Sequence, residues 1–176
     1  MEAALYIRRA KPDDCALIFA IHKDSVLGLC ASHYSDTQMS AWFEGRASDD
    51  YTTAVELGSC WIAYKADDPV GFLGLFANRI SMIFVQSAAS GQGIGTILLH
   101  FALDRIREAG NSSAILDATL NAQGFYEKYG FRKVADSHLV RPSGMKIETV
   151  VMERSIRSPP RGRNRDRTVA DGRAMS

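Results

Sequence analysis

Three glycines within five residues, Gly91, Gly93 and Gly95, separate two apolar segments that differ in periodicity. The segment before them, residues 80–85, is short and rich in β-branched residues, and it predicts a buried strand. The segment after them repeats apolar residues at helical spacing as far as Ala109, which predicts an amphipathic helix. A helix that begins at such a turn presents unpaired N–H groups and the positive end of its dipole. The sequence therefore predicts an anion site, whose usual occupant is phosphate.

The spacing of this loop indicates which phosphate ligand it suits. A dinucleotide-binding G-x-G-x-x-G loop is excluded because Thr96 stands three residues after Gly93, and a P-loop is excluded because no lysine precedes the threonine. The order Gly91-x-Gly93-Ile94-Gly95 after a strand resembles the pyrophosphate loop of the GNAT acyltransferases, which bind acetyl-CoA. Ser90 stands where that family has Arg or Gln, so side-chain help to the phosphates is weaker while the backbone groups remain. A glycine-rich helix start that serves packing alone is the alternative.

A second motif lies in residues 122–131, where Ala122, the pair Phe125-Tyr126 and the exit Gly130-Phe131 follow one another. It resembles the late helix of the same acetyltransferases, and two motifs in the right order are more specific than either one alone. The resemblance extends over residues 5–154 and leaves out only the C-terminal tail. It implies an α+β fold of the GNAT acyl-CoA N-acyltransferase type, with a mixed central sheet of about seven strands flanked by helices.

The resemblance also implies how the donor, acetyl-CoA, is held and used as a co-substrate. In the family the pantetheine arm lies between two parallel strands, which we expect to splay apart after Val85 and Ala118. A backbone N–H near Phe84 or Val85 would polarise the thioester carbonyl. Tyr126 would protonate the leaving thiolate, since a phenol of pKa about 10 can give its proton to a thiolate whose conjugate thiol has a pKa of about 8.5; packing beside Phe125 is its alternative role. The residues predicted to bind the donor are Phe84, Val85, Ser90, Gly91, Gln92, Gly93, Ile94, Gly95, Thr96, Thr119 and Phe125.

The acceptor side has no readable motif. Thr119, on the donor side, stands where the family often has an asparagine that bonds the pantetheine arm. A protonated amine must lose a proton before it attacks, and three carboxylates are candidates for that base, each equally suited to an ordinary surface position: Glu44, Asp117 and Glu148. Three residues of the early helical region suit either the acceptor or the core: His33, Tyr34 and Trp42.

Composition and charge bound the class of protein. The 176 residues suit one domain with an ample core. From Arg157 onward, six arginines and two aspartates give the tail a charge of +4, so the rest of the chain carries −3, which argues against nucleic-acid binding. We therefore expect an acetyltransferase domain in residues 1–156 and a basic, disordered tail in residues 157–176. The three widely spaced cysteines have no metal spacing and predict reduced core thiols: Cys15, Cys30 and Cys60.

The remaining elements follow from periodicity, turn residues and caps. We expect strands at residues 5–10, 60–65, 70–76 and 114–118, the last parallel to the strand at 80–85, and a final hairpin of 131–135 with 147–152. We expect three early helices. The first starts at Pro12 and ends at Gly28, the second starts after the N-cap Ser35, and the third runs from Asp49 to Gly58. A late helix should end at Gly130.

The sequence predicts an N-acetyltransferase that moves an acetyl group from acetyl-CoA to a primary amine of a small molecule or peptide, by direct attack in a ternary complex. The alternative is an acyl-CoA-binding regulatory module without turnover, which the departures at Ser90 and Thr119 keep open. No signal peptide or apolar run long enough for a bilayer is visible, so we expect a cytoplasmic protein with no metal, membrane or nucleic-acid partner. A homodimer is common in the family.

Overall fold

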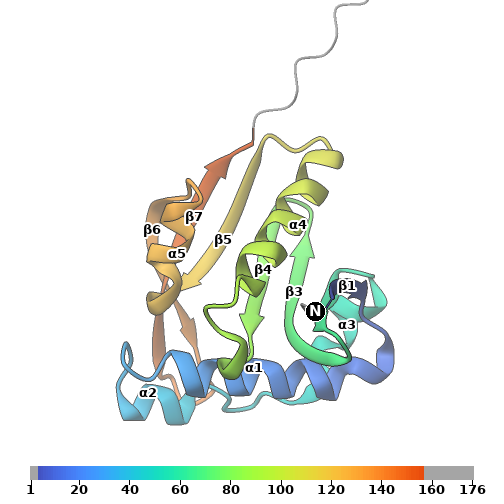
Figure 1. The fold of residues 1–176 in the computed structure, drawn as a ribbon. Helices are drawn as coiled ribbons and strands as arrows, with labels where there is room; N and C mark the ends of the chain where they lie inside the picture. Colours follow the sequence, from blue (N-terminus) through green and yellow to red (C-terminus); the bar gives the residue numbers. More distant parts are fainter. Residues whose placement is uncertain (1–3, 157–176) are drawn as a thin grey trace, which may run out of the picture.

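The computed structural model describes residues 4–156, so the predicted basic tail lies outside the described residues. Seven strands form one mixed sheet in the order β1-β2-β3-β4-β5-β7-β6, which confirms the predicted fold class (Figure 1). The strands are β1 (Leu5–Arg9), β2 (Cys60–Lys65), β3 (Asp68–Phe76), β4 (Arg79–Val85), β5 (Ser113–Thr119), β6 (Arg132–Val140) and β7 (Lys146–Ser155). The α-helices are α1 (Cys15–Leu29), α2 (Asp36–Ala41), α3 (Thr52–Glu56), α4 (Ile94–Glu108) and α5 (Gln123–Lys128). Four short 3-10 helices are η1 (Pro12–Asp14), η2 (Ser48–Tyr51), η3 (Ser87–Ala89) and η4 (Leu120–Ala122).

Helices cover both faces of the sheet. The strand β3 shows this division, because successive side chains of a strand point to opposite faces. Leu73 packs in the cluster formed with α4 and α5, whereas Phe72 packs in the cluster formed with α1 and α3. Figure 1 shows α4 lying along β3 and β4, with α1 extending from the neighbourhood of α3 to that of α2. Both faces of β3 are therefore buried over residues 70–75.

The sheet is split between its parallel strands β4 and β5. They pair at only two positions, Arg79 with Ile115 and Ile80 with Leu116, so the splay begins earlier than the predicted points Val85 and Ala118. The cause is a bulge, because Leu75 of β3 pairs with Ile80 and the preceding residue of β3 pairs with Met82, which leaves Ser81 as an extra residue of β4. A bulge bends its strand and increases the local twist. That distortion turns the rest of β4 away from β5.

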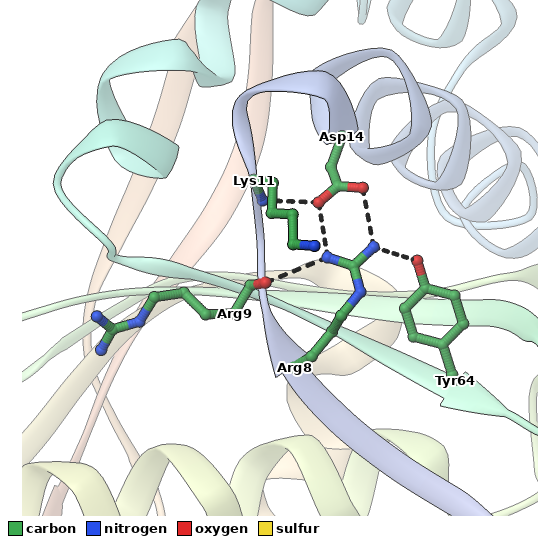
Figure 2. Close-up of polar contacts among 5 residues, drawn as sticks. All are labelled: Arg8, Arg9, Lys11, Asp14 and Tyr64. Atoms are coloured by element: carbon green, nitrogen blue, oxygen red, sulfur yellow. Dashed lines mark hydrogen bonds and ion pairs between the residues drawn. The ribbon is translucent and has the colours of Figure 1, made fainter.

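The first helix is anchored at its start by an ion-pair network. The two terminal nitrogens of Arg8, Nη1 and Nη2, donate to the Asp14 carboxylate at 2.7 and 2.9 Å (Figure 2). Nη2 also donates to the Tyr64 hydroxyl at 2.6 Å. The backbone N–H of Lys11 donates to the same carboxylate at 2.6 Å, which closes the turn (Figure 2). This arrangement raises the pKa of Arg8 and lowers the pKa of Asp14. It ties α1 to β1 and β2.

The prediction that Gly28 ends the first helix is wrong, since α1 continues to Leu29. Gly28 is present because of a close approach: a Cβ at this position would lie 2.5 Å from the Cβ of Ser87 in η3. Asp24, one turn earlier, accepts hydrogen bonds from the backbone N–H and the hydroxyl of Ser87 at 2.6 and 3.2 Å. The helix therefore holds the segment that leads into the glycine loop.

Other predicted boundaries differ at the ends of elements. Asp68 and Pro69 belong to β3 rather than to the turn, and α2 ends at Ala41, so Trp42 follows the helix. The last hairpin is longer than predicted because β6 continues to Val140 as an edge strand with almost no buried residue, so no apolar alternation marks it. The predicted N-cap Ser35 is confirmed, as its hydroxyl accepts from the Gln38 backbone N–H.

All three cysteines are free and buried, as predicted. Burial raises the pKa of the Cys30 thiol to about 11 and that of Cys60 to about 12, so both thiols are protonated at neutral pH. Within residues 4–156, no helix combines the length and hydropathy that crossing a membrane requires. The same residues contain no group of three or more side chains arranged to hold a metal ion.

Replacing Gly28 by alanine should lower the free energy of unfolding by about 1–3 kcal/mol, because the new Cβ forces η3 away from α1. The matched control is Gly124→Ala in α5, where an added Cβ meets nothing within 4 Å. That change should stabilise the protein by up to about 1 kcal/mol through helix propensity. Urea unfolding measures both, and a stabilised Gly28→Ala protein would contradict the packing argument.

Candidate functional site: the glycine loop and the gap between β4 and β5

The loop between β4 and α4 is built for close approach to its backbone. Gly91 and Gly93 have φ angles of +75° and +81°, a conformation that favours glycine. A Cβ on either residue would meet nothing within 4 Å, so the space beside them is open. Gly93 is the N-cap of α4, whose first-turn N–H groups have no intrahelical partner. By contrast, a Cβ at Gly95 would lie 3.6 Å from the Phe125 ring, an ordinary van der Waals distance, so the space beside this glycine is filled by α5.

A cavity of about 450 Å³ adjoins this loop. Every residue predicted for donor binding lines it except Gln92, and Tyr126 lines it as well. Gln92 turns the other way: its amide oxygen accepts from Lys65 at 2.7 Å and its nitrogen donates to the carbonyl of Ala88 at 3.1 Å. Sequence reasoning missed other lining residues, among them Ser25, Cys30 and Asn121. Ser25 and Cys30 come from α1 and the turn after it, and no local motif marked them.

Tyr126 is held by aromatic packing in α5. Its side chain is 6% exposed and its ring lies 5.1 Å from that of Phe125 and 5.7 Å from that of Phe131. Among residues 4–156, no side chain or backbone group forms a hydrogen bond with its hydroxyl. Burial raises the pKa of Tyr126 above its ordinary value, so the phenol keeps its proton at neutral pH. The residue borders both the 450 Å³ cavity and the narrow space between β4 and β5.

Tyr34 has a structural role that explains its burial. Its hydroxyl accepts a hydrogen bond from the backbone N–H of Leu120 and donates one to the carbonyl of Glu148, both at 2.8 Å. Cys30 donates to the side-chain oxygen of Asn121 at 3.2 Å. The end of α1 therefore fixes η4, which precedes the helix that carries Tyr126, against β7.

A second cavity, of about 320 Å³, lies on the other side of the gap. Phe84 and Thr119 line both cavities, so the two meet between β4 and β5. Of the three carboxylates considered as bases, Asp117 lines this cavity and forms an ion pair with Arg79. The other two are engaged elsewhere, Glu44 with Ser143 and Glu148 with Gln38.

The three residues considered for acceptor contact have different places. Trp42 lines the second cavity, although its side chain is only 2% exposed. Tyr34 is buried in the core described above, and His33 contacts Ser32 at an exposed turn. His22, which the sequence did not mark as a site residue, also lines the second cavity and bonds Tyr51 at 2.7 Å. Burial lowers the pKa of His22 to about 3, so its imidazole is neutral.

Comparison with known proteins decides the family. A model of the acetyltransferase (GNAT) domain matches residues 30–153. The chain belongs to the GNAT acetyltransferase family. A relative described as peptidyl-lysine N-acetyltransferase YjaB from Salmonella typhimurium is 30% identical over 135 residues, which are 76% of this chain and 87% of the relative. Another, described as the uncharacterized N-acetyltransferase YafP from Escherichia coli, is 29% identical over 74% of this chain and 83% of the relative.

Solved structures agree with this assignment. A GCN5-related N-acetyltransferase from Rhodopseudomonas palustris is 27% identical, with a TM-score of 0.79 over 89% of this chain and 98% of that one. The yncA structure from Salmonella typhimurium, which contains its cofactor acetyl-CoA, has a TM-score of 0.63 at 19% identity over 91% of this chain and 99% of that one, and shows the shared fold. The protein is therefore an acyltransferase with the GNAT fold, in which the first sequence motif forms the glycine loop before α4 and the second forms α5 and its exit.

Replacing Tyr34 by phenylalanine should lower the free energy of unfolding by about 1–3 kcal/mol, because it leaves the Leu120 N–H buried without its partner. Tyr6→Phe is the control: that side chain is 46% exposed, and no described residue bonds its hydroxyl. Chemical denaturation measures both variants. Equal stability of the two would contradict the role assigned to Tyr34.

Proposed function

We propose that this GNAT acyltransferase moves an acetyl group from acetyl-CoA to a primary amine by direct attack in a ternary complex. The observation that carries the proposal is the pair of cavities that meet at Phe84 and Thr119 in the gap between β4 and β5. Two substrates can thus approach one point from opposite sides without either leaving first. The amine class is supported by the peptidyl-lysine N-acetyltransferase among the relatives. A small-molecule or peptide amine in the cytoplasm is the proposed acceptor.

The residues beside the larger cavity fit acetyl-CoA. The open, positive-φ backbone at Gly91 and Gly93 suits a bulky diphosphate, and the start of the fifteen-residue helix α4 offers N–H groups and a favourable dipole. The yncA structure, with its cofactor acetyl-CoA, shares this fold. Ser90, Thr96 and Thr119 add hydroxyl groups along the same lining. When bound, acetyl-CoA would supply the activated acetyl group.

The gap supplies the groups that the transfer needs. Beyond Ile80, the edge of β4 that faces β5 has no strand partner, so backbone N–H groups near Phe84 and Val85 are available to polarise a carbonyl oxygen. Tyr126 borders the gap with a protonated phenol and can donate that proton to a leaving thiolate. Asp117 lies at the same gap on the acceptor side and can accept a proton from the amine through water.

The loop assignment is tested by a pair of glycine variants. Gly93 and Gly110 have the same φ of +81°, and an added Cβ would meet nothing within 4 Å at either position. Alanine should therefore destabilise both by a similar amount, about 1–2 kcal/mol. Only Gly93→Ala should weaken coenzyme A binding in calorimetry, by about 10-fold or more, since its Cβ enters the space proposed for the diphosphate. Equal affinity of the two variants for coenzyme A would refute the assignment.

The role of Tyr126 is tested by Tyr126→Phe, which keeps the ring packing and removes the hydroxyl. The value of kcat should fall by about 10²–10⁴-fold with little change in acetyl-CoA affinity, because the proton is needed in the transition state. The loss should shrink when the acyl donor has a more acidic leaving thiol. Tyr129→Phe removes another hydroxyl from the same cavity, one that bonds Thr96 at 2.8 Å, and should show no such dependence on the thiol.

Measurement of free thiol released from acetyl-CoA across a panel of amines separates these outcomes. Turnover with an intact kcat in Tyr126→Phe would make Tyr126 a packing residue. Acetyl-CoA binding without thiol release for any amine would leave an acyl-CoA-binding module and overturn the proposed activity.

A further inference from the structure

Two arginines from distant parts of the chain line the second cavity. Arg46 precedes η2, and Arg141 follows β6 at the turn into β7. Among the ion pairs of residues 4–156, none involves either guanidinium. The guanidinium of Arg46 lies 5.9 Å from the centre of the Tyr51 ring, a contact that orients the side chain.

The two arginines are held next to each other by contacts between their own neighbours. Ser143 donates a hydrogen bond to Glu44 at 2.5 Å. A Cβ at Gly45 would lie 2.9 Å from Pro142, so the two loops touch at this point. Residues on both sides of the contact thus fix the loop before η2 against the turn between β6 and β7. These two contacts, Ser143 with Glu44 and Gly45 with Pro142, hold Arg46 and Arg141 close together.

The site has polar groups that lack a partner. The Nε of Arg141 and the hydroxyl of Thr149 are buried without a hydrogen bond among the described residues, and Thr149 is 4% exposed. Burial and the nearby charge of Arg46 lower the pKa of Arg141, whereas the charge of Glu44 acts in the opposite direction. Buried donors of this kind are normally satisfied. A bound anion would satisfy them.

The acidic residues of the same cavity are already engaged. Asp50 accepts a hydrogen bond from the backbone N–H of Ala47 at 3.0 Å, and Asp117 pairs with Arg79. Asp117 also borders the space between β4 and β5, whereas the arginines do not. Of these four charged residues, only Asp117 lies at the gap, where the amine reacts, and the two arginines lie away from it. Two arginines away from the gap and one carboxylate at the gap match a molecule with an anionic group at one end and an amine at the other.

We propose that the second cavity binds the carboxylate of the acceptor through Arg46, Arg141 and Thr149, so that the acceptor is an amine that also bears a carboxylate, as an amino acid does. The planar guanidinium fork matches a carboxylate in geometry and charge. A volume of about 320 Å³ suits a small molecule rather than a long peptide segment. The amine of such an acceptor extends toward Asp117, Phe84 and Thr119 at the gap. This inference rests on the proposed acetyltransferase activity and adds the acceptor class to it.

The test compares L-amino acids with the corresponding amino-acid amides as acceptors. The quantity measured is the ratio of kcat/KM for acid over amide, so differences in amine reactivity cancel between protein variants. Arg141→Met should lower this ratio by about 10- to 100-fold, as expected for a lost charge-assisted hydrogen bond. Arg141→Lys should restore part of it. The control Arg105→Met removes an exposed charge from α4, where Arg105 pairs with Glu108, and should leave the ratio unchanged.

If the acid-to-amide ratio of kcat/KM is identical in the wild type and in Arg141→Met, the carboxylate site is overturned. Thiol release with the amides would in that case still support the transferase activity. If no amine releases thiol, the activity fails and calorimetry decides the site separately, with N-acetyl amino acids and N-acetyl amino-acid amides as probes. The site would be supported if the acids bind more tightly than the amides to the wild type and this difference disappears in Arg141→Met. Equal affinity for acids and amides would overturn it.

Discussion

The active region depends on the interruption of hydrogen bonding between β4 and β5. After two paired positions, the bulge at Ser81 turns β4 away, while β4 stays paired with β3 as far as Val85 and β5 stays paired with β7 as far as Thr119. Backbone polar groups in a protein interior need partners. The gap therefore creates two strand edges whose free N–H and C=O groups can bind an extended ligand, and both cavities open onto those edges.

An interrupted sheet needs other contacts to hold its two parts in register, and α1 provides them. Ile18 and Ile21, in its first half, pack with the cluster around β2 and β3. Val26 and Cys30, at its end, pack with Ile147 of β7 across the gap. The hydrogen bonds of Tyr34 to Leu120 and Glu148 extend the same link to η4. The separation of β4 from β5 is thus maintained by a helix that is packed against both halves, so the site is preformed.

The sequence predicted the parts of the site that are encoded locally. The glycine loop, the helix after it and the aromatic motif around Tyr126 are each formed by one short continuous stretch of sequence, where spacing and periodicity are informative. The bulge at Ser81 was not predictable, because it depends on the register between two strands. The requirement for glycine at position 28 arises from contact with Ser87, a residue 59 positions away, and was therefore not predictable from the local sequence. The extent of β6 was missed because an exposed edge strand has no apolar alternation.

The two sides of the gap therefore differ in how the chain encodes them. The larger cavity is lined mainly by the continuous unit of β4, the glycine loop and α4 and by the segment from Thr119 to Tyr129, with additional residues from α1, so its shape is set by the fold itself. The second cavity includes residues from the loop before η2 and from the turn between β6 and β7, and such connecting segments tolerate sequence change better than strands do. In the proposed function, the shared backbone keeps one donor, and the acceptor is selected by Arg46 and Arg141 in the loops. The brace between Gly45 and Pro142 matters for this reason, because loop residues discriminate between acceptors only when their positions are fixed.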